Sequence, residues 1–100
     1  MRTTPLKLVT VVAEALLEDR LVQDLRRCGA RGYTVTGAHG EGSRGVRASD
    51  WEGGNVRVEV LVGPEVADRI LELLAEAYFP RFAVVAFLQD VQVVRGDKYA

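Results

Sequence analysis

Apolar residues recur along the first half of the chain in two different periods, and these periods predict its local structure. Residues 6–13 (LKLVTVVA) are rich in β-branched side chains and predict a first strand. From residue 14 to residue 28 the apolar positions follow helical spacing, with acids early and arginines late, and Gly29 is typical of a helix end. Residues 32–38 (GYTVTGA) favour a strand again.

The second half of the chain predicts a strand, a helix and a final strand region. Residues 56–62 (VRVEVLV) alternate between apolar and charged side chains, which indicates a half-buried strand. Pro64 can occupy the first turn of a helix that Pro80 ends. Residues 82–88 and 91–94 then predict one long strand or two short ones. This order of elements predicts an α+β, ferredoxin-like (split βαβ) fold with two helices on one face of an antiparallel sheet.

Length, charge and cysteine content narrow the class of protein. The chain has 100 residues, 48% of them hydrophobic, which suits a single domain over residues 1–100 that gains stability by self-association. A net charge of −1 lacks the positive field that nucleic acid would require, so no nucleic-acid partner is expected. The single cysteine, Cys28, fits a reducing compartment, and no apolar run is long enough to span a bilayer. We therefore expect a cytoplasmic protein.

Between residues 39 and 55 the sequence holds five glycines and no apolar period, which predicts a long loop. Residues 39–47 of this loop read HGEGSRGVR. Glycine amides can form a nest for phosphate oxygens, and Arg44 and Arg47 could close over it with charge-assisted hydrogen bonds. The segment lacks the Gly-Lys-Ser/Thr end of a P-loop, so a flexible polar turn remains the alternative.

Other reactive side chains compete with structural interpretations. His39 is the only histidine and has no nearby partner for a metal site, so no metal ligands are expected. Cys28 follows two arginines at a helix end, where core packing is expected rather than a reactive thiolate. Nothing in the sequence brings Glu59 and Asp90 together as an acid–base pair, so we expect no catalytic residues and no enzyme. Four aromatic residues around Pro80 predict a hydrophobic corner, with adenine stacking as the alternative: Tyr78, Phe79, Phe82 and Phe87.

The order of elements and the loop together resemble the PII-like signalling proteins, and within them the bicarbonate-transport-associated group often called SbtB. The resemblance covers nearly the whole chain and is most specific at residues 29–35 (GARGYTV), 40–47 (GEGSRGVR) and 55–61 (NVRVEVL). It implies a homotrimer that binds an adenine nucleotide (AMP, cyclic AMP, ADP or ATP) in clefts between subunits. A mobile T-loop, here about residues 39–55, would report the bound ligand to a partner.

Carried over by position, the resemblance also implies site residues. Thr34 would line the adenosine cleft, and Arg95 would reach into the neighbouring subunit's site. The phosphate would be held by Gly40, Gly42, Ser43, Arg44 and Arg47. No cofactor is required, and bicarbonate is a candidate second ligand at Arg44 or Arg47. The implied partner is a membrane transporter, which would bring the protein to the membrane surface, or another regulated protein of carbon metabolism.

The family's phosphate-binding B-loop should fall at residues 79–84 (FPRFAV). The glycine-rich, lysine-containing pattern is absent there, and Arg81 is the one cation left, which argues against tight triphosphate binding. Two other functions compete with a nucleotide sensor. One is a CutA-like metal-binding trimer, suggested by the Trp51-Glu-Gly-Gly run, and the other is a slow nucleotide hydrolase that holds magnesium through Glu41 or Asp50.

Overall fold

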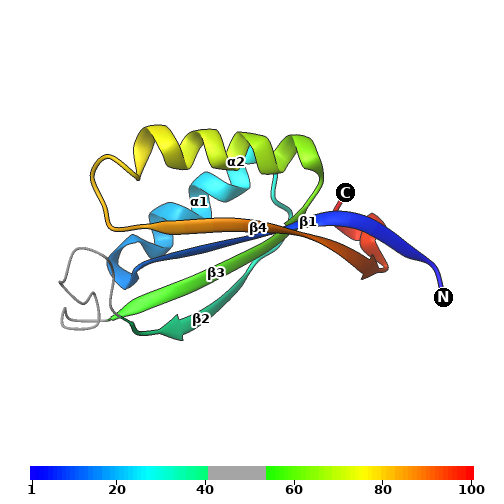
Figure 1. Ribbon diagram of the computed structural model, residues 1–100, viewed down its shortest axis with the longest axis horizontal. Helices are drawn as coiled ribbons and strands as arrows, with labels where there is room; N and C mark the ends of the chain where they lie inside the picture. The colour runs from blue at the N-terminus through cyan, green and yellow to red at the C-terminus, as the bar shows by residue number, and fades with distance from the viewer. Residues whose placement is uncertain (41–53) are drawn as a thin grey trace.

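The computed structural model describes residues 1–40 and 54–100. Four strands form one antiparallel sheet in the order β2-β3-β1-β4, and both helices lie on one face of it (Figure 1). The strands are β1 (Thr3–Glu14), β2 (Thr34–Ala38), β3 (Asn55–Val62) and β4 (Val85–Val94). The helices are α1 (Glu18–Cys28) and α2 (Pro64–Ala77), and short 3-10 turns follow β1 and β4 as η1 (Ala15–Leu17) and η3 (Gly96–Lys98). The predicted ferredoxin-like fold is confirmed.

The hydrophobic core lies between the helices and one face of the sheet. The alternation predicted for β3 is confirmed, because its four valines are buried while Arg57 and Glu59 point to the opposite face. The helices contribute Leu21, Leu25, Ile70 and Leu74 to this core. The opposite face, which we call the open face, has no helix on it in the described parts of the chain. The fold therefore leaves one side of the sheet available to another molecule.

The helix ends follow the sequence signals, except at the start of α1. Gly29 has a φ of 117°, in the left-handed region that favours glycine, and its N–H donates to the Arg26 carbonyl at 3.0 Å. Pro64 occupies the first helical position of α2, as predicted. The helix predicted from residue 14 begins only at Glu18. The Ala15 N–H is bonded to the Gly54 carbonyl at 2.9 Å, so the chain first leaves the sheet through η1.

Strand β1 is longer than predicted and includes Pro5. A proline is tolerated in a strand where the ladder does not need its missing N–H. β3 pairs with β1 only from Lys7 onward, so Pro5 has β4 as its one neighbouring strand. β2 starts at Thr34, two residues later than predicted.

The final region forms one long strand, which starts at Val85 rather than at Phe82. The predicted aromatic corner holds for two of its four members. Tyr78 is fully buried and its ring centroid lies 6.0 Å from that of Phe82. Phe79 is exposed, and Phe87 lies on the open face because the register pairs it with Thr10. The corner is therefore a Tyr78–Phe82 pair.

Candidate functional site

Polar side chains from three neighbouring strands gather on the open face. Thr34 on β2 and Thr10 on β1 both pair with Glu59 on β3, from opposite sides. Residues that are directly paired in an antiparallel sheet share a face, so their side chains are neighbours. The Thr10 hydroxyl donates to Glu59 Oε2 at 3.3 Å, and Arg57 Nη2 lies 3.3 Å from the same oxygen. We call Thr10, Thr34, Thr36, Arg57 and Glu59 the polar row.

The polar row combines hydroxyl, guanidinium and carboxylate groups with different exposure. Thr10 is completely buried, whereas Thr34 and Arg57 are exposed. The Thr36 hydroxyl lies 3.5 Å from the Arg57 carbonyl, which ties β2 to β3. The exposed Thr34 hydroxyl and Arg57 guanidinium can donate hydrogen bonds to a ligand, and the Glu59 carboxylate can accept them. Of these residues the sequence singled out Thr34 through the family resemblance and weighed Glu59 only for catalysis.

The predicted loop begins where the polar row ends. Ala38 pairs with Asn55, and this pair closes the base of the loop. Gly54 has a φ of 63°, in the left-handed region, and its carbonyl accepts the bond from Ala15. Gly40 is exposed at the last described position before the loop. The other predicted phosphate ligands, Gly42, Ser43, Arg44 and Arg47, lie outside the described residues, as do Glu41, Asp50 and Trp51.

Arg95 lies at the opposite end of the sheet from this loop. Thr3 pairs with Val94, while Glu14 pairs with Asn55. The eleven residue steps between Thr3 and Glu14 on β1 correspond to roughly 36 Å at about 3.3 Å per step. Arg95 therefore does not meet Thr34 or Gly40 within one protomer. It has a φ of 60°, which is uncommon for a residue with a side chain.

The turn between α2 and β4 lies at the same end of the sheet as the base of the loop (Figure 1). The Tyr78 carbonyl closes this turn by accepting hydrogen bonds from the N–H groups of Arg81 at 3.0 Å and Phe82 at 2.8 Å. Arg81 is exposed. These hydrogen bonds hold the backbone of the turn, and the Arg81 side chain is exposed on it.

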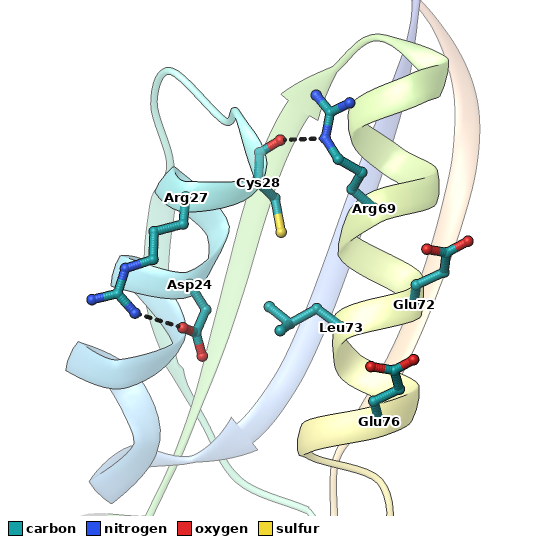
Figure 2. Close-up of a pocket in the computed structure, with 7 residues that line it drawn as sticks. All are labelled: Asp24, Arg27, Cys28, Arg69, Glu72, Leu73 and Glu76. Atoms are coloured by element: carbon teal, nitrogen blue, oxygen red, sulfur yellow. Dashed lines mark hydrogen bonds and ion pairs between the residues drawn. The ribbon is translucent and has the colours of Figure 1, made fainter.

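A groove also separates the two helices, on the side of the molecule away from the open face (Figure 2). It is lined by Asp24, Arg27, Cys28, Arg69, Glu72, Leu73 and Glu76. Burial and the Asp24 carboxylate raise the pKa of the Cys28 thiol, with Arg69 opposing them, so a nucleophilic thiolate is disfavoured. Arg69 Nε donates to the Cys28 carbonyl at 2.9 Å. Cys28 also packs against the core, as predicted.

Glu59 and Asp90, which were considered as an acid–base pair, do not lie on the same face of the sheet. Glu59 faces the open side with the polar row, whereas Asp90 pairs with Lys7, whose side chain points to the helix side. Across residues 1–40 and 54–100, no group of three His, Cys, Asp or Glu side chains is placed to hold a metal ion. Neither helix of the described chain is long and apolar enough to cross a membrane.

Comparison with known proteins now identifies the family. The family model described as nitrogen regulatory protein P-II matches residues 6–98. The chain belongs to the P-II family. Because the match covers nearly the whole chain, it includes both the polar row and the strands that carry the loop.

Solved structures of P-II-like proteins agree with this assignment. A candidate PII-like signalling protein from Thermus thermophilus is 56% identical, with 100% of both chains covered and a TM-score of 0.88. CPII from Thiomonas intermedia K12, bound to ADP and bicarbonate, is 25% identical over 99% of this chain and 98% of its own, with a TM-score of 0.89. CPII bound to ADP, AMP and bicarbonate is 26% identical over 98% of this chain and 96% of its own, with a TM-score of 0.88. The resemblance read from the sequence is thereby confirmed at the level of the family.

Proposed function

We propose that this P-II family chain is a regulatory protein that binds an adenine nucleotide in clefts between the subunits of a homotrimer. The observation that carries the proposal is the polar row, which lies beside the base of the loop. The similar protein CPII was solved with ADP, AMP and bicarbonate. We propose a regulatory rather than a catalytic role because the chain belongs to the family described as nitrogen regulatory protein P-II.

In this proposal the adenosine lies against β2, with Thr34 as a contact and Glu59 as its polar neighbour. The phosphate is held at the loop by Gly40, Gly42, Ser43, Arg44 and Arg47. Arg95 acts from the neighbouring subunit, because roughly 36 Å of sheet separate it from the loop of its own chain. Bicarbonate is proposed as a second anion at Arg44 or Arg47.

The open face supports the trimer. Val85 and Phe87 are 60% and 41% exposed there, and they add apolar area to half-buried residues of the neighbouring strands: Leu8, Val12 and Leu61. Burying such area is the main favourable term in stable association. The trimer would also bring a second chain to the edge of the polar row, which a cleft between subunits requires.

Ligand binding would be reported through the loop at residues 39–55. A nucleotide that binds one loop conformation more tightly than another shifts the population toward it, and a partner can recognise that conformation. We propose a cytoplasmic protein whose partner is a membrane transporter or another regulated protein of carbon metabolism. At such a transporter the protein would lie at the membrane surface without entering it.

Calorimetric titration with AMP, cyclic AMP, ADP and ATP, each with and without bicarbonate, tests the proposal. We expect binding of at least one adenine nucleotide with a dissociation constant in the micromolar range, about −8 kcal/mol. GTP is the matched control, because it carries the same phosphates on a different base. No heat with any adenine nucleotide, together with unchanged thermal stability at millimolar ligand, would refute the function.

A further inference from the structure

The surface of the two helices that points away from the sheet carries opposite charges on its two sides. On α2 the four acidic side chains recur every three or four residues, so they share one face of the helix. All four are exposed: Glu65, Asp68, Glu72 and Glu76. None of their carboxylates makes a hydrogen bond or an ion pair with another group in residues 1–40 and 54–100. The α2 side of this surface is therefore acidic.

The other side of this surface is basic at the end of α1. Arg26 and Arg27 are both exposed there, and 75% of the Arg27 side chain is accessible to solvent. Cations at this position are also favoured by the dipole of the helix. Near the start of α1, Asp19 and Arg20 have opposite charges, so the excess of positive charge lies at the end of the helix.

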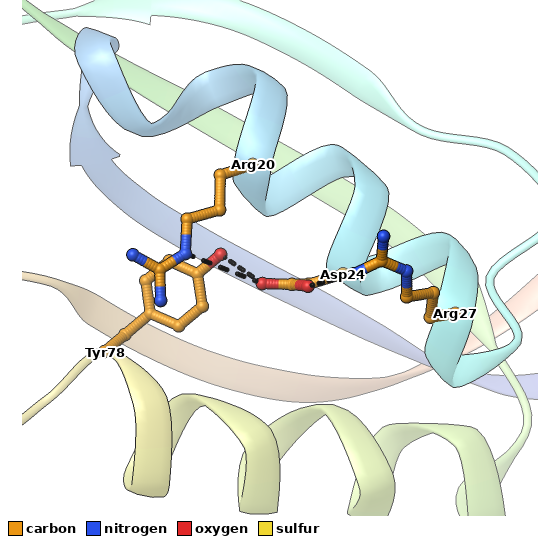
Figure 3. Close-up of polar contacts among 4 residues, drawn as sticks. All are labelled: Arg20, Asp24, Arg27 and Tyr78. Carbon is orange, nitrogen blue, oxygen red and sulfur yellow. Dashed lines mark hydrogen bonds and ion pairs between the residues drawn. The ribbon is translucent and has the colours of Figure 1, made fainter.

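Asp24, the remaining acid in the second half of α1, is engaged inside the protein (Figure 3). The Tyr78 hydroxyl donates to Asp24 Oδ2 at 2.6 Å, and Arg20 Nε lies 4.0 Å from the same oxygen. Arg27 Nη1 lies 3.4 Å from Oδ1. Only 16% of the Asp24 side chain is exposed, so a second molecule would meet Arg27 rather than Asp24.

The basic end of α1 lies beside the acidic residues of α2. Arg69 Nε donates to the carbonyl of the last residue of α1 at 2.9 Å. Arg26 and Arg27 are therefore at the level of Asp68 and Glu72, which flank Arg69 along α2. Arg27 and Glu72 line the groove between the helices, on its two sides (Figure 2), whereas Arg26 and Asp68 do not line it. Each helix thus has one of these charges at the groove and one away from it.

A surface with two oppositely charged sides restricts what can dock on it. A uniformly acidic partner would meet the carboxylates of α2, and a uniformly basic partner would meet the arginines of α1. A second copy of this chain avoids both when a two-fold axis runs along the groove, because α1 of each copy then faces α2 of the other. Such an axis keeps each residue at its level, and residues at the groove face residues at the groove. Arg27 then faces the partner's Glu72, and Arg26 faces the partner's Asp68.

We propose that the outer surface of α1 and α2 is a docking surface for a second copy of this chain, with Arg26 and Arg27 of each copy paired with Asp68 and Glu72 of the other. This contact goes beyond the proposed function and needs no nucleotide. The helices and the open face lie on opposite sides of the sheet (Figure 1), so the contact can join copies that already form a trimer. Exposed ion pairs contribute little each, so we expect a dissociation constant of about 1 mM at low salt.

Sedimentation equilibrium of the full chain at low and high salt measures this association. Charges on the two copies act over about 30 Å in about 10 mM salt and over about 3 Å in about 1 M salt. At about 1 mM chain, a dissociation constant of about 1 mM leaves half of the chains paired, so the average mass should be about 1.5-fold higher at low salt. Phe87→Glu, which alters the open face, should keep this dependence on salt.

Two double variants test which residues face each other, and both keep the net charge of the wild type. Arg26→Glu with Asp68→Lys reverses one proposed pair and leaves the other intact, so it should associate like the wild type. Arg26→Glu with Glu72→Lys instead places like charges in both proposed pairs, and its average mass should no longer depend on salt. The variants share Arg26→Glu and differ in the position of the lysine, which lies on the exposed side of α2 in both. Circular dichroism should show the same helix content in both, since exposed substitutions rarely disturb a fold.

The outcomes separate this contact from the proposed function. A wild-type mass that is the same at low and high salt would overturn the docking surface, whether or not the protein binds a nucleotide. Equal association of the two double variants would also overturn it, because the charges would then attract without regard to position. Failure to bind any adenine nucleotide would refute the proposed function and leave the docking surface standing.

Discussion

Gly96 packs so closely against Thr4 that a Cβ atom at position 96 would lie only 2.6 Å from the Cβ of Thr4. Gly96 is buried at the start of η3, where the chain folds back from β4 onto β1. The adjacent Arg95 adopts its left-handed conformation at this same bend. The contact therefore fixes the direction in which the chain leaves β4.

Gly96→Ala should lower the free energy of unfolding by about 1–3 kcal/mol, because the added methyl group forces Thr4 and η3 apart. Chemical denaturation measures this loss. Gly37→Ala is the matched control, since a Cβ at position 37 meets no atom within 4 Å, and its stability should be unchanged or slightly higher. Equal stability of Gly96→Ala and the wild type would contradict the close contact.

The pH dependence of stability should report on Tyr78. Burial, together with the hydrogen bond to Asp24 and its negative charge, raises the pKa of the Tyr78 hydroxyl far above its ordinary value of 10.0. The folded protein then keeps the phenolic proton at a pH where the unfolded chain has lost it. This contribution is fully present below about pH 10 and is lost as the pH rises further.

Denaturation at about pH 8 and at about pH 11 measures the effect. The free energy of unfolding should be lower at about pH 11 than at about pH 8. Tyr78→Phe should make this decrease smaller. Tyr33→Phe, at an exposed tyrosine, is the control and should leave the fall unchanged. An identical alkaline loss in wild type and Tyr78→Phe would rule out the buried proton.

Arg47→Ala should weaken AMP binding by roughly 1.5–3 kcal/mol, as expected for loss of a charged hydrogen-bonding partner of the phosphate. Calorimetric titration measures the change. Arg69→Ala removes a guanidinium from the groove between the helices, outside the proposed site, and should bind AMP like the wild type. Unchanged affinity in Arg47→Ala would remove this residue from the proposed site.

Light scattering should give the mass of a trimer, about 33 kDa for three chains of 11.0 kDa. Phe87→Glu places a charge in the apolar part of the open face and should shift the mass toward one chain. Ala75→Glu places the same charge on the exposed side of α2 and should remain trimeric. A single-chain mass for the wild type at micromolar concentration would exclude a cleft between subunits.

The sequence by itself determined the elements and the family. The strict alternation of residues 56–62 located β3 to within one residue, because a half-buried strand requires that period. Gly29 and Pro64 marked helix ends, since each has a backbone property that the position demands. The P-II family could be recognised because those strands and the glycine-rich loop are contiguous stretches of sequence.

Element boundaries were less accurate where a long-range contact decided them. The Ala15–Gly54 hydrogen bond delayed the start of α1 to Glu18. Similarly, Pro5 can lie inside β1 because β3 pairs with β1 only from Lys7 onward. Local propensity contains no information about either partner.

Only the tertiary structure decided which side chains meet. Thr10 and Glu59 are 49 residues apart in sequence, and Asp24 and Tyr78 are 54 apart. Register between strands, and the seating of helices on a sheet, are set by how whole apolar faces pack together. The alternation of residues 56–62 shows that the Glu59 side chain points away from the core. Which strands lie beside β3 is decided by the packing of the complete sheet.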